Sequence, residues 1–288
     1  MKKNWYLAIL AIVLAGVIFS GDIKTLWDKG TARITENFHA EELLADLKTE
    51  IFTPPPLRQE FGPQDSYLTA AGVVKFTNQH RNGDGLPGLA VNAKLSEAAK
   101  AKVDDMFARQ YFEHVSPVGV GADQLVKSAG YSFILVGENL ALGNYEDDAL
   151  LVQAWMDSPG HRENILNERF TEIGVAVKRG TFEGKSTWLA VQEFGKPLSD
   201  CPTVNESLRV AIENGQVSLD SLQVQIEQKQ TELDAAKTNK REDRQTYNQK
   251  VAEFNALVNT YNAKLEVLKK QIAEYNSEVQ EFNVCIAV

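Results

Sequence analysis

The chain has 288 residues, with 30 Lys and Arg against 39 Asp and Glu, so its formal net charge is −9. A nucleic-acid-binding protein needs a basic surface to neutralise phosphates, and this acidic balance argues against that class. The length suffices for about two folded units, and the charged and hydrophobic fractions, 24% and 43%, are typical of a soluble globular protein.

Residues 1–21 begin with two lysines, Lys2 and Lys3, and continue with an almost purely apolar stretch from Trp5 to Phe19. This pattern is typical of a secretory signal or of a short membrane anchor. We favour an uncleaved anchor, because the end of the stretch matches a small-x-small cleavage site poorly. The lysines of an anchor stay on the cytoplasmic side. Both alternatives place the rest of the chain outside the cytoplasm.

Two segments follow before the first folded domain. Residues 22–50 carry a loose helical pattern of apolar residues, which predicts a juxtamembrane helical segment. Residues 51–65 contain Pro54, Pro55 and Pro56, which lack N–H donors and have a fixed φ. We therefore expect residues 51–65 to form a stiff, extended, Pro-rich linker.

Residues 66–197 are predicted to form a mixed α/β domain. Apolar residues recur at helical spacing in three stretches, and alternate in two stretches joined by the Gly-rich connection "RGTFEGK". Ser96 is the candidate N-cap of the second helix. The expected helices cover 68–82, 93–110 and 148–158, and the expected antiparallel hairpin pairs 173–177 with 186–194.

Residues 201–288 are rich in Asn, Gln, Glu and Lys, and their apolar residues step by four and three, as in a coiled coil. Two such seams are present, and an antiparallel hairpin pairs every layer in one constant register, with Leu222 opposite Leu265. That hairpin brings Cys201 beside Cys285, so we expect a disulfide at its open end. The alternative is one long helix that dimerises in parallel.

Two histidines and one carboxylate stand in segments rich in small and turn residues. His114 lies in "YFEHVSP", Glu138 in "GENLALG", and His161 in "SPGHRENIL", where Pro159 and Gly160 form a turn before the first helical turn. In one cleft these residues have three possible uses. His114 and His161 suit a divalent metal such as zinc, a carboxylate can orient a histidine for acid–base work, and the set can be a purely structural hydrogen-bond network.

These three segments, with "AWMDSPGHRENIL", "FTEIGVAV" and "VQEFG", resemble the successive motifs of the CAP superfamily of cysteine-rich secretory, antigen 5 and pathogenesis-related 1 proteins. The bacterial SCP-like extracellular branch is the most similar, and the resemblance covers roughly residues 68–195. It implies an α+β fold, an α-β-α sandwich with helices on both faces of a central antiparallel sheet.

The resemblance also implies a large cleft lined by two histidines and two glutamates. Three of these positions carry over to His114, Glu138 and His161. The fourth, a glutamate three residues after a tryptophan in eukaryotic members, is Ser158 here. This departure weakens the case for a four-residue metal or proteolytic mechanism.

The function expected from the sequence is binding, by an extracytoplasmic CAP-domain protein attached to the membrane through its N-terminal segment. The expected ligand of the cleft is a metal, a lipid, a cell-wall component or a peptide. A hydrolase or protease that uses the cleft histidines is the first alternative. The second is a structural surface protein whose coiled-coil hairpin binds protein partners.

Overall fold

The computed structural model describes residues 49–60, 62–63, 65–238 and 243–287. The expected anchor over 1–21, and nearly all of the expected helical segment over 22–50, lie outside the described residues. None of the helices in the described ranges is long and apolar enough to cross a membrane. The described chain divides into two compact units, an α/β unit that ends at Thr203 and also includes the last residues from Phe282, and a helical unit, Val204–Glu281.

The α/β unit is built on a sheet with the strand order β1-β4-β6-β5-β3, in which β2 also pairs with β4. Its centre is antiparallel, as expected. The strands β4 (Phe133–Gly143) and β5 (Glu172–Phe182) both pair with β6 (Lys185–Pro197). The expected hairpin is β5–β6, and its turn at Glu183 and Gly184 has positive φ at both residues, which matches the twist of the two strands.

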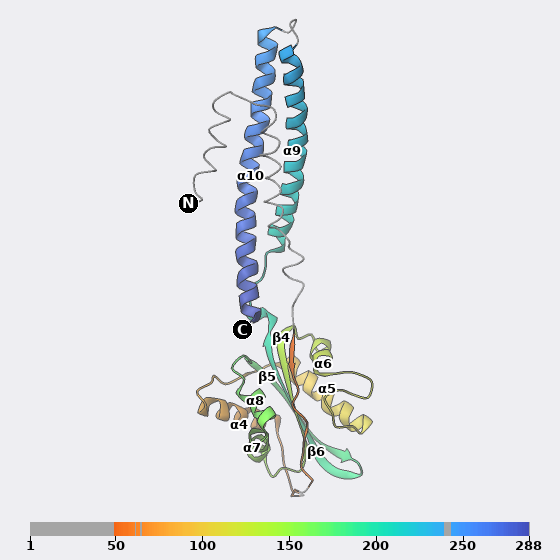
Figure 1. The fold of residues 1–288 in the computed structure, drawn as a ribbon. Helices are drawn as coiled ribbons and strands as arrows, with labels where there is room; N and C mark the ends of the chain where they lie inside the picture. Colours follow the sequence, from red (N-terminus) through yellow and green to blue (C-terminus); the bar gives the residue numbers. More distant parts are fainter. Residues whose placement is uncertain (1–48, 61, 64, 239–242, 288) are drawn as a thin grey trace. The chain divides into compact units, whose positions relative to one another are not determined.

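Helices cover both faces of this sheet (Figure 1), as the α-β-α sandwich requires. One face carries α4 (Ala70–Gly83), α7 (Asp148–Asp157) and α8 (Pro159–Leu166). The other face carries α5 (Ala93–Arg109) and α6 (Ala122–Ser128).

The N-cap of α5 differs from the prediction. It is Asn92, whose side-chain oxygen accepts a hydrogen bond from Lys94 N at 2.9 Å, and not Ser96. The Ser96 hydroxyl lies within the first turn and donates to the main-chain oxygen of Asn92. Both residue types are good caps, and the pairing of β3 (Ala90–Val91) with β5 ends directly before Asn92, which is therefore the residue in the N-cap position.

The segment predicted to be a linker over 51–65 is extended, but it is part of the sheet. Glu50–Phe52 (β1) and Leu57–Arg58 (β2) both pair with β4 in parallel orientation. Proline cannot donate to a strand ladder, so it is tolerated at a sheet edge or an interruption. Pro54, Pro55 and Pro56 lie in the interruption between β1 and β2, and this explains why a Pro-rich stretch still joins a sheet.

The C-terminal unit is the expected antiparallel pair of long helices, α9 (Glu206–Thr238) and α10 (Arg244–Ala287), drawn in Figure 1. Apolar residues of both arms form one buried cluster. The predicted disulfide between Cys201 and Cys285 is present within the chain, which rules out the single long helix.

The register of the two arms stays a prediction. A Cβ added at Gly215 would lie 3.1 Å from Leu268 Cδ1, and Lys229 pairs with Glu253 at 3.1 Å. In knobs-into-holes packing one side chain contacts four residues of the facing helix, so a contact of Leu268 with Gly215 does not exclude Leu219 as its opposite residue. These contacts agree with the predicted pairing to within about one helical turn.

Candidate functional site

His114 and Glu138 are in direct contact, as the sequence suggested. His114 lies in the loop between α5 and α6, and Lys102 Nζ donates to its main-chain oxygen at 2.5 Å. Its ring Nδ1 lies 2.6 Å from Glu138 Oε1, and the Glu138 side chain on β4 is fully buried. Its Nε2 lies 2.5 Å from the main-chain oxygen of Pro54. A carbonyl oxygen only accepts hydrogen bonds, so Nε2 carries a proton and acts as the donor.

A second glutamate belongs to this cluster, and sequence reasoning missed it. Glu193 on β6 is the cross-strand partner of Glu138, and its side chain is also fully buried. Burial, and then the negative charge of Glu138, raise the pKa of Glu193 well above its usual value, which favours its uncharged form. Two adjacent buried carboxylates would repel each other, and keeping one neutral relieves that repulsion.

Lys102 is the other buried charged group that the sequence analysis left out. It lies on the buried face of α5, is fully buried, and has its pKa lowered by that burial, while the charge of Glu138 acts in the opposite direction. The sequence carried a signal for both residues. Lys102 interrupts the apolar face of an amphipathic helix, and Glu193 interrupts an apolar strand; such charges are rarely buried unless they are paired.

His161 occupies the first turn of α8, as predicted, and only 1% of it is exposed. Its Nδ1 lies 2.8 Å from Ser158 Oγ, so Ser158 caps α8 by position but makes no side-chain cap bond to the backbone. Burial, and then the charge of His114, lower the pKa of His161 to about 4, which leaves the ring neutral at pH 7. Within the described residues its buried Nε2 has no hydrogen-bond partner.

Two asparagines fix the position of α8 against β4. Asn139 Nδ2 donates to the main-chain oxygen of His161 at 3.2 Å, and Asn164 Nδ2 donates to Asn139 Oδ1 at 2.9 Å. Successive side chains of a strand point to opposite faces, so Glu138 and Asn139 face opposite sides of the sheet. His114 therefore approaches β4 on the Glu138 side, and His161 belongs to the Asn139 side.

Pro54 lies against both His114 and the start of α8. Its carbonyl oxygen accepts from His114, and a Cβ added at Gly160, next to His161, would lie 2.7 Å from the Cβ of Pro54. Asn164 Nδ2 also donates to the main-chain oxygen of Phe52 at 3.2 Å. The predicted site residues thus come together at the edge of β4, and a stretch of the chain's own backbone lies against them.

The expected zinc pair, His114 and His161, stays a prediction. In the described residues both ring nitrogens of His114 have hydrogen-bond partners, Glu138 and Pro54, and His161 Nδ1 contacts Ser158 Oγ. Across the described ranges, no group of three or more His, Cys, Asp or Glu side chains is arranged to hold a metal ion. A metal shared by the two histidines would require Pro54 to leave His114.

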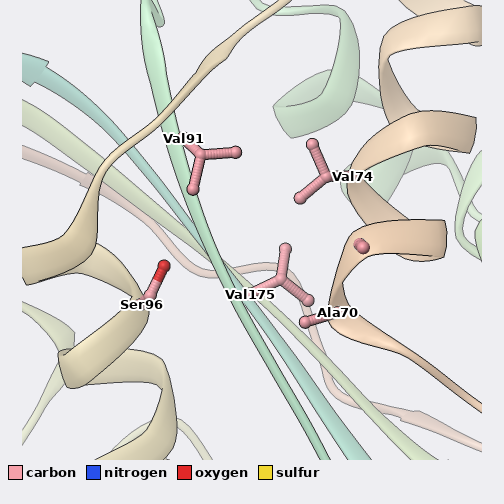
Figure 2. A pocket seen from close by; sticks show the side chains of 6 residues that line it. Ala70, Val74, Val91, Ser96 and Val175 are labelled. Atoms are coloured by element: carbon pink, nitrogen blue, oxygen red, sulfur yellow. The ribbon is translucent and has the colours of Figure 1, made fainter.

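A surface pocket of about 330 Å³ lies elsewhere in the domain (Figure 2). It lies between α4, the start of α5, β3 and β5, and Figure 2 shows Val74, Val91 and Val175 around it. Its only polar side chain is Ser96, whose hydroxyl already donates to Asn92 O. It contains none of the predicted site residues and no charged group that would orient a ligand.

Part of the chain is similar to known proteins. Residues 74–194 match the model of the cysteine-rich secretory protein family, CAP. The chain is 43% identical over 122 residues to "Uncharacterized protein YkwD" of Bacillus subtilis, covering 42% of this chain and 45% of that protein. It is 30% identical over 130 residues to "Uncharacterized membrane protein YlbC" of the same organism, covering 45% of this chain and 37% of that one. The chain therefore spans less than half of the length of these curated relatives.

A solved structure, an extracellular protein containing a SCP domain from Bacillus anthracis, is 31% identical. The alignment covers 44% of this chain and 40% of that one, with a TM-score of 0.39. The family match begins at residue 74, so the stretch that contacts His114 through Pro54 lies outside the matched residues.

Proposed function

Residues 74–194 belong to the cysteine-rich secretory protein (CAP) family, and we propose that this CAP domain is an extracytoplasmic module that binds extended peptide segments at the edge of β4. One observation carries the proposal: the Nε2 of His114 lies 2.5 Å from the main-chain oxygen of Pro54, in a stretch that is extended along β4. The cleft residues thus already hold a peptide.

The contacts to this stretch are largely of a kind that any peptide can make. His114 and Asn164 donate to the main-chain oxygens of Pro54 and Phe52, and the main-chain N–H of Gln59 donates to Leu142 O at 2.8 Å. Addition of an extended segment to a sheet edge is a common mode of peptide recognition, in which main-chain hydrogen bonds supply affinity. The His114–Glu138 pair fits this role, because Glu138 fixes the ring that presents Nε2–H.

The hydrolase alternative has weaker support. Ser158 and His161 are the nearest approach to a nucleophile and its base, with 2.8 Å between Oγ and Nδ1. A pKa of about 4 makes His161 a poor base at neutral pH. Its Nε2 has no carboxylate partner among the described residues to orient the ring, as an activated nucleophile requires. We therefore do not propose a reaction.

The proposed location is outside the cytoplasm. The Cys201–Cys285 disulfide supports it, because disulfides persist in oxidising compartments, as does the apolar stretch within residues 1–21. One relative is named a membrane protein. We propose that the N-terminal segment attaches the protein to a membrane and that the peptide ligand belongs to a partner at the cell surface. Lipids, cell-wall components and protein partners of the helical hairpin remain alternatives for other surfaces.

Selection of peptides on the full chain tests the proposal. The receptor is the full-length protein with Phe52→Ala, which weakens the hold on its own stretch, and the ligands are displayed random twelve-residue peptides. We expect selected peptides to bind, and to lose at least tenfold in affinity when His114→Ala or Gly160→Ala is added. His80→Ala, on the α4 helix away from β4, is the matched control. Failure to select any peptide, or equal binding by both cleft variants, would contradict the proposal.

A further inference from the structure

The chain's own stretch Glu50–Arg58, here called the resident segment, has a defined register on β4. Glu50 pairs with Leu135, and Leu57 pairs with Ala141. Between β1 and β2 the resident segment has one residue more than β4, so it bulges opposite Glu138, Asn139 and Leu140. The bulge consists of Thr53 and three prolines, which have no N–H groups to leave unpaired.

Alternate residues of the resident segment face the domain. Phe52, Pro54 and Pro56 are half-buried, whereas Ile51 and Thr53 are exposed. This is the period of a strand that presents one side to a partner. The domain can therefore read alternate side chains, in addition to the main chain.

The first contact is to an acidic side chain. Arg169 makes two hydrogen bonds to the carboxylate of Glu50, at 2.8 and 3.2 Å, and this pairing lowers the pKa of Glu50. Two parallel bonds between a guanidinium and a carboxylate give geometric specificity as well as attraction.

The second contact is to an aromatic ring. Phe52 packs edge-on against Phe170, with ring centroids 6.1 Å apart, and Phe170 stacks on Phe194 in the core at 5.4 Å. Gly137, the register partner of Phe52, keeps this place open, since a Cβ there would lie 2.7 Å from Phe170 Cζ. An edge-to-face aromatic pair is favoured over a pair with an aliphatic side chain.

Of the last two contacts, one lies in the bulge and the other follows it. Pro54 presents its carbonyl to His114 and its ring to Gly160, where no Cβ intervenes. Arg58 places its guanidinium 5.8 Å from the ring centre of Phe112 and 5.6 Å from that of Phe182, and it pairs with Glu183 at 3.2 Å. All of these receptor side chains belong to the domain itself.

The surface along β4 that contacts the resident segment is here called the groove. We infer that the groove recognises a sequence pattern in an extended peptide. The pattern is an acidic residue, an aromatic residue two positions later, a proline two positions after the aromatic residue, and an arginine four positions after the proline. The resident segment is a tethered copy of that ligand, and it competes with segments of the same pattern from a partner protein. This inference rests on the proposed peptide binding and adds its specificity. The resident segment lies outside the matched family residues, 74–194. A short tether gives it a high effective concentration, so modest affinity keeps the groove occupied.

A labelled synthetic peptide with the sequence of residues 49–60, TEIFTPPPLRQE, tests the inference against full-length protein. The weakened receptor carries Glu50→Ala and Phe52→Ala in its own resident segment. We expect the peptide to bind this receptor at least tenfold more tightly than it binds the wild-type chain, which its own segment occupies. Fluorescence anisotropy gives both affinities, and circular dichroism confirms that the variants are folded.

Altered peptides test the reading of side chains. A peptide with Phe52→Ala is expected to lose at least tenfold in affinity, and one with Thr53→Ala, an exposed position, is expected to bind unchanged. Arg169→Glu in the weakened receptor should abolish binding of the original peptide and restore it for a peptide with Glu50→Lys. This reciprocal exchange does not depend on how well any single variant folds.

Equal affinity of the Phe52→Ala and Thr53→Ala peptides would overturn the pattern. Equal affinity of the wild-type and weakened receptors would overturn the competition. If random peptides bind the groove but the 49–60 peptide does not, the pattern is wrong and the proposed function stands. If neither binds, the proposed function fails with it.

Discussion

Glu138 and Glu193 are cross-strand partners on β4 and β6, and both side chains are fully buried. Glu138 Oε1 lies 2.6 Å from Nδ1 of the His114 imidazole. Burial, and then the charge of Glu138, raise the pKa of Glu193, which favours its uncharged form. Glu138 therefore orients His114, beside a second glutamate whose uncharged form is favoured.

Glu193→Gln is expected to change how stability depends on pH. The pKa of Glu193 is raised in the folded state, so above its ordinary value of 4.5 the unfolded chain loses this proton first and the free energy of unfolding falls as pH rises. One such group changes stability by at most about 1.4 kcal/mol per pH unit. The glutamine variant should lose less stability than wild type between pH 5 and 8 in urea unfolding. Parallel curves for the two proteins would show that Glu193 is ionised.

For His161 we expect the opposite pH dependence of the free energy of unfolding. Its pKa is lowered to about 4 in the folded state, so the unfolded chain takes up the proton first as pH falls below about 6.5, and stability is lost between about 6.5 and 4. The loss amounts to about 3 kcal/mol at most for this shift. We expect His161→Gln to remove this part of the acid sensitivity in urea unfolding. An imidazole proton signal from His161 that titrates near pH 6.5 would contradict the expectation.

The buried side chain of Arg81 makes hydrogen bonds to the main chain at the end of α8. Its guanidinium donates to the main-chain oxygens of Pro87, Ile165, Asn167 and Phe170. Arg81→Lys cannot reproduce this fork and leaves buried acceptors unpaired, so we expect a loss of about 3 kcal/mol or more in unfolding free energy.

Arg109→Lys is the matched control for Arg81. Arg109 makes an exposed pair with Asp105 along α5, so its replacement should cost under about 0.5 kcal/mol. Similar losses for the two variants would mean that the main-chain contacts of Arg81 add little stability.

The Cys201–Cys285 disulfide closes a loop with a sequence separation of 84 residues. Chain entropy gives such a closure an effect of about 4 to 5 kcal/mol as an upper estimate. Reduction, or replacement of both cysteines by serine, should lower the melting temperature of the helical signal without changing the helical spectrum at low temperature. An unchanged melting temperature would show that packing between α9 and α10 stabilises the hairpin without help from the disulfide.

The sequence by itself determined the parts of this protein whose physics is local or periodic. Heptad spacing predicted the two arms of the hairpin, and alternation predicted β5 and β6. The resemblance of the motifs around His114, Glu138 and His161 to the CAP superfamily implied the α-β-α sandwich, and His114 and Glu138 are in contact. Each of these signals is carried by neighbouring residues or by a fixed repeat, so it is visible before the chain folds.

Only the tertiary structure decided the rest. Pairing of Glu50–Phe52 and Leu57–Arg58 with β4 depends on contacts more than 80 residues apart in the chain, so a Pro-rich stretch resembled a linker. Heptad spacing fits more than one alignment of the two arms, so their register depends on contacts between the arms, such as Lys229 with Glu253 at 3.1 Å. The groups that surround Lys102 and Glu193, and the Pro54 carbonyl that accepts from His114, depend on which elements meet at the edge of β4. That meeting is set by packing of the whole domain, and no local pattern encodes it.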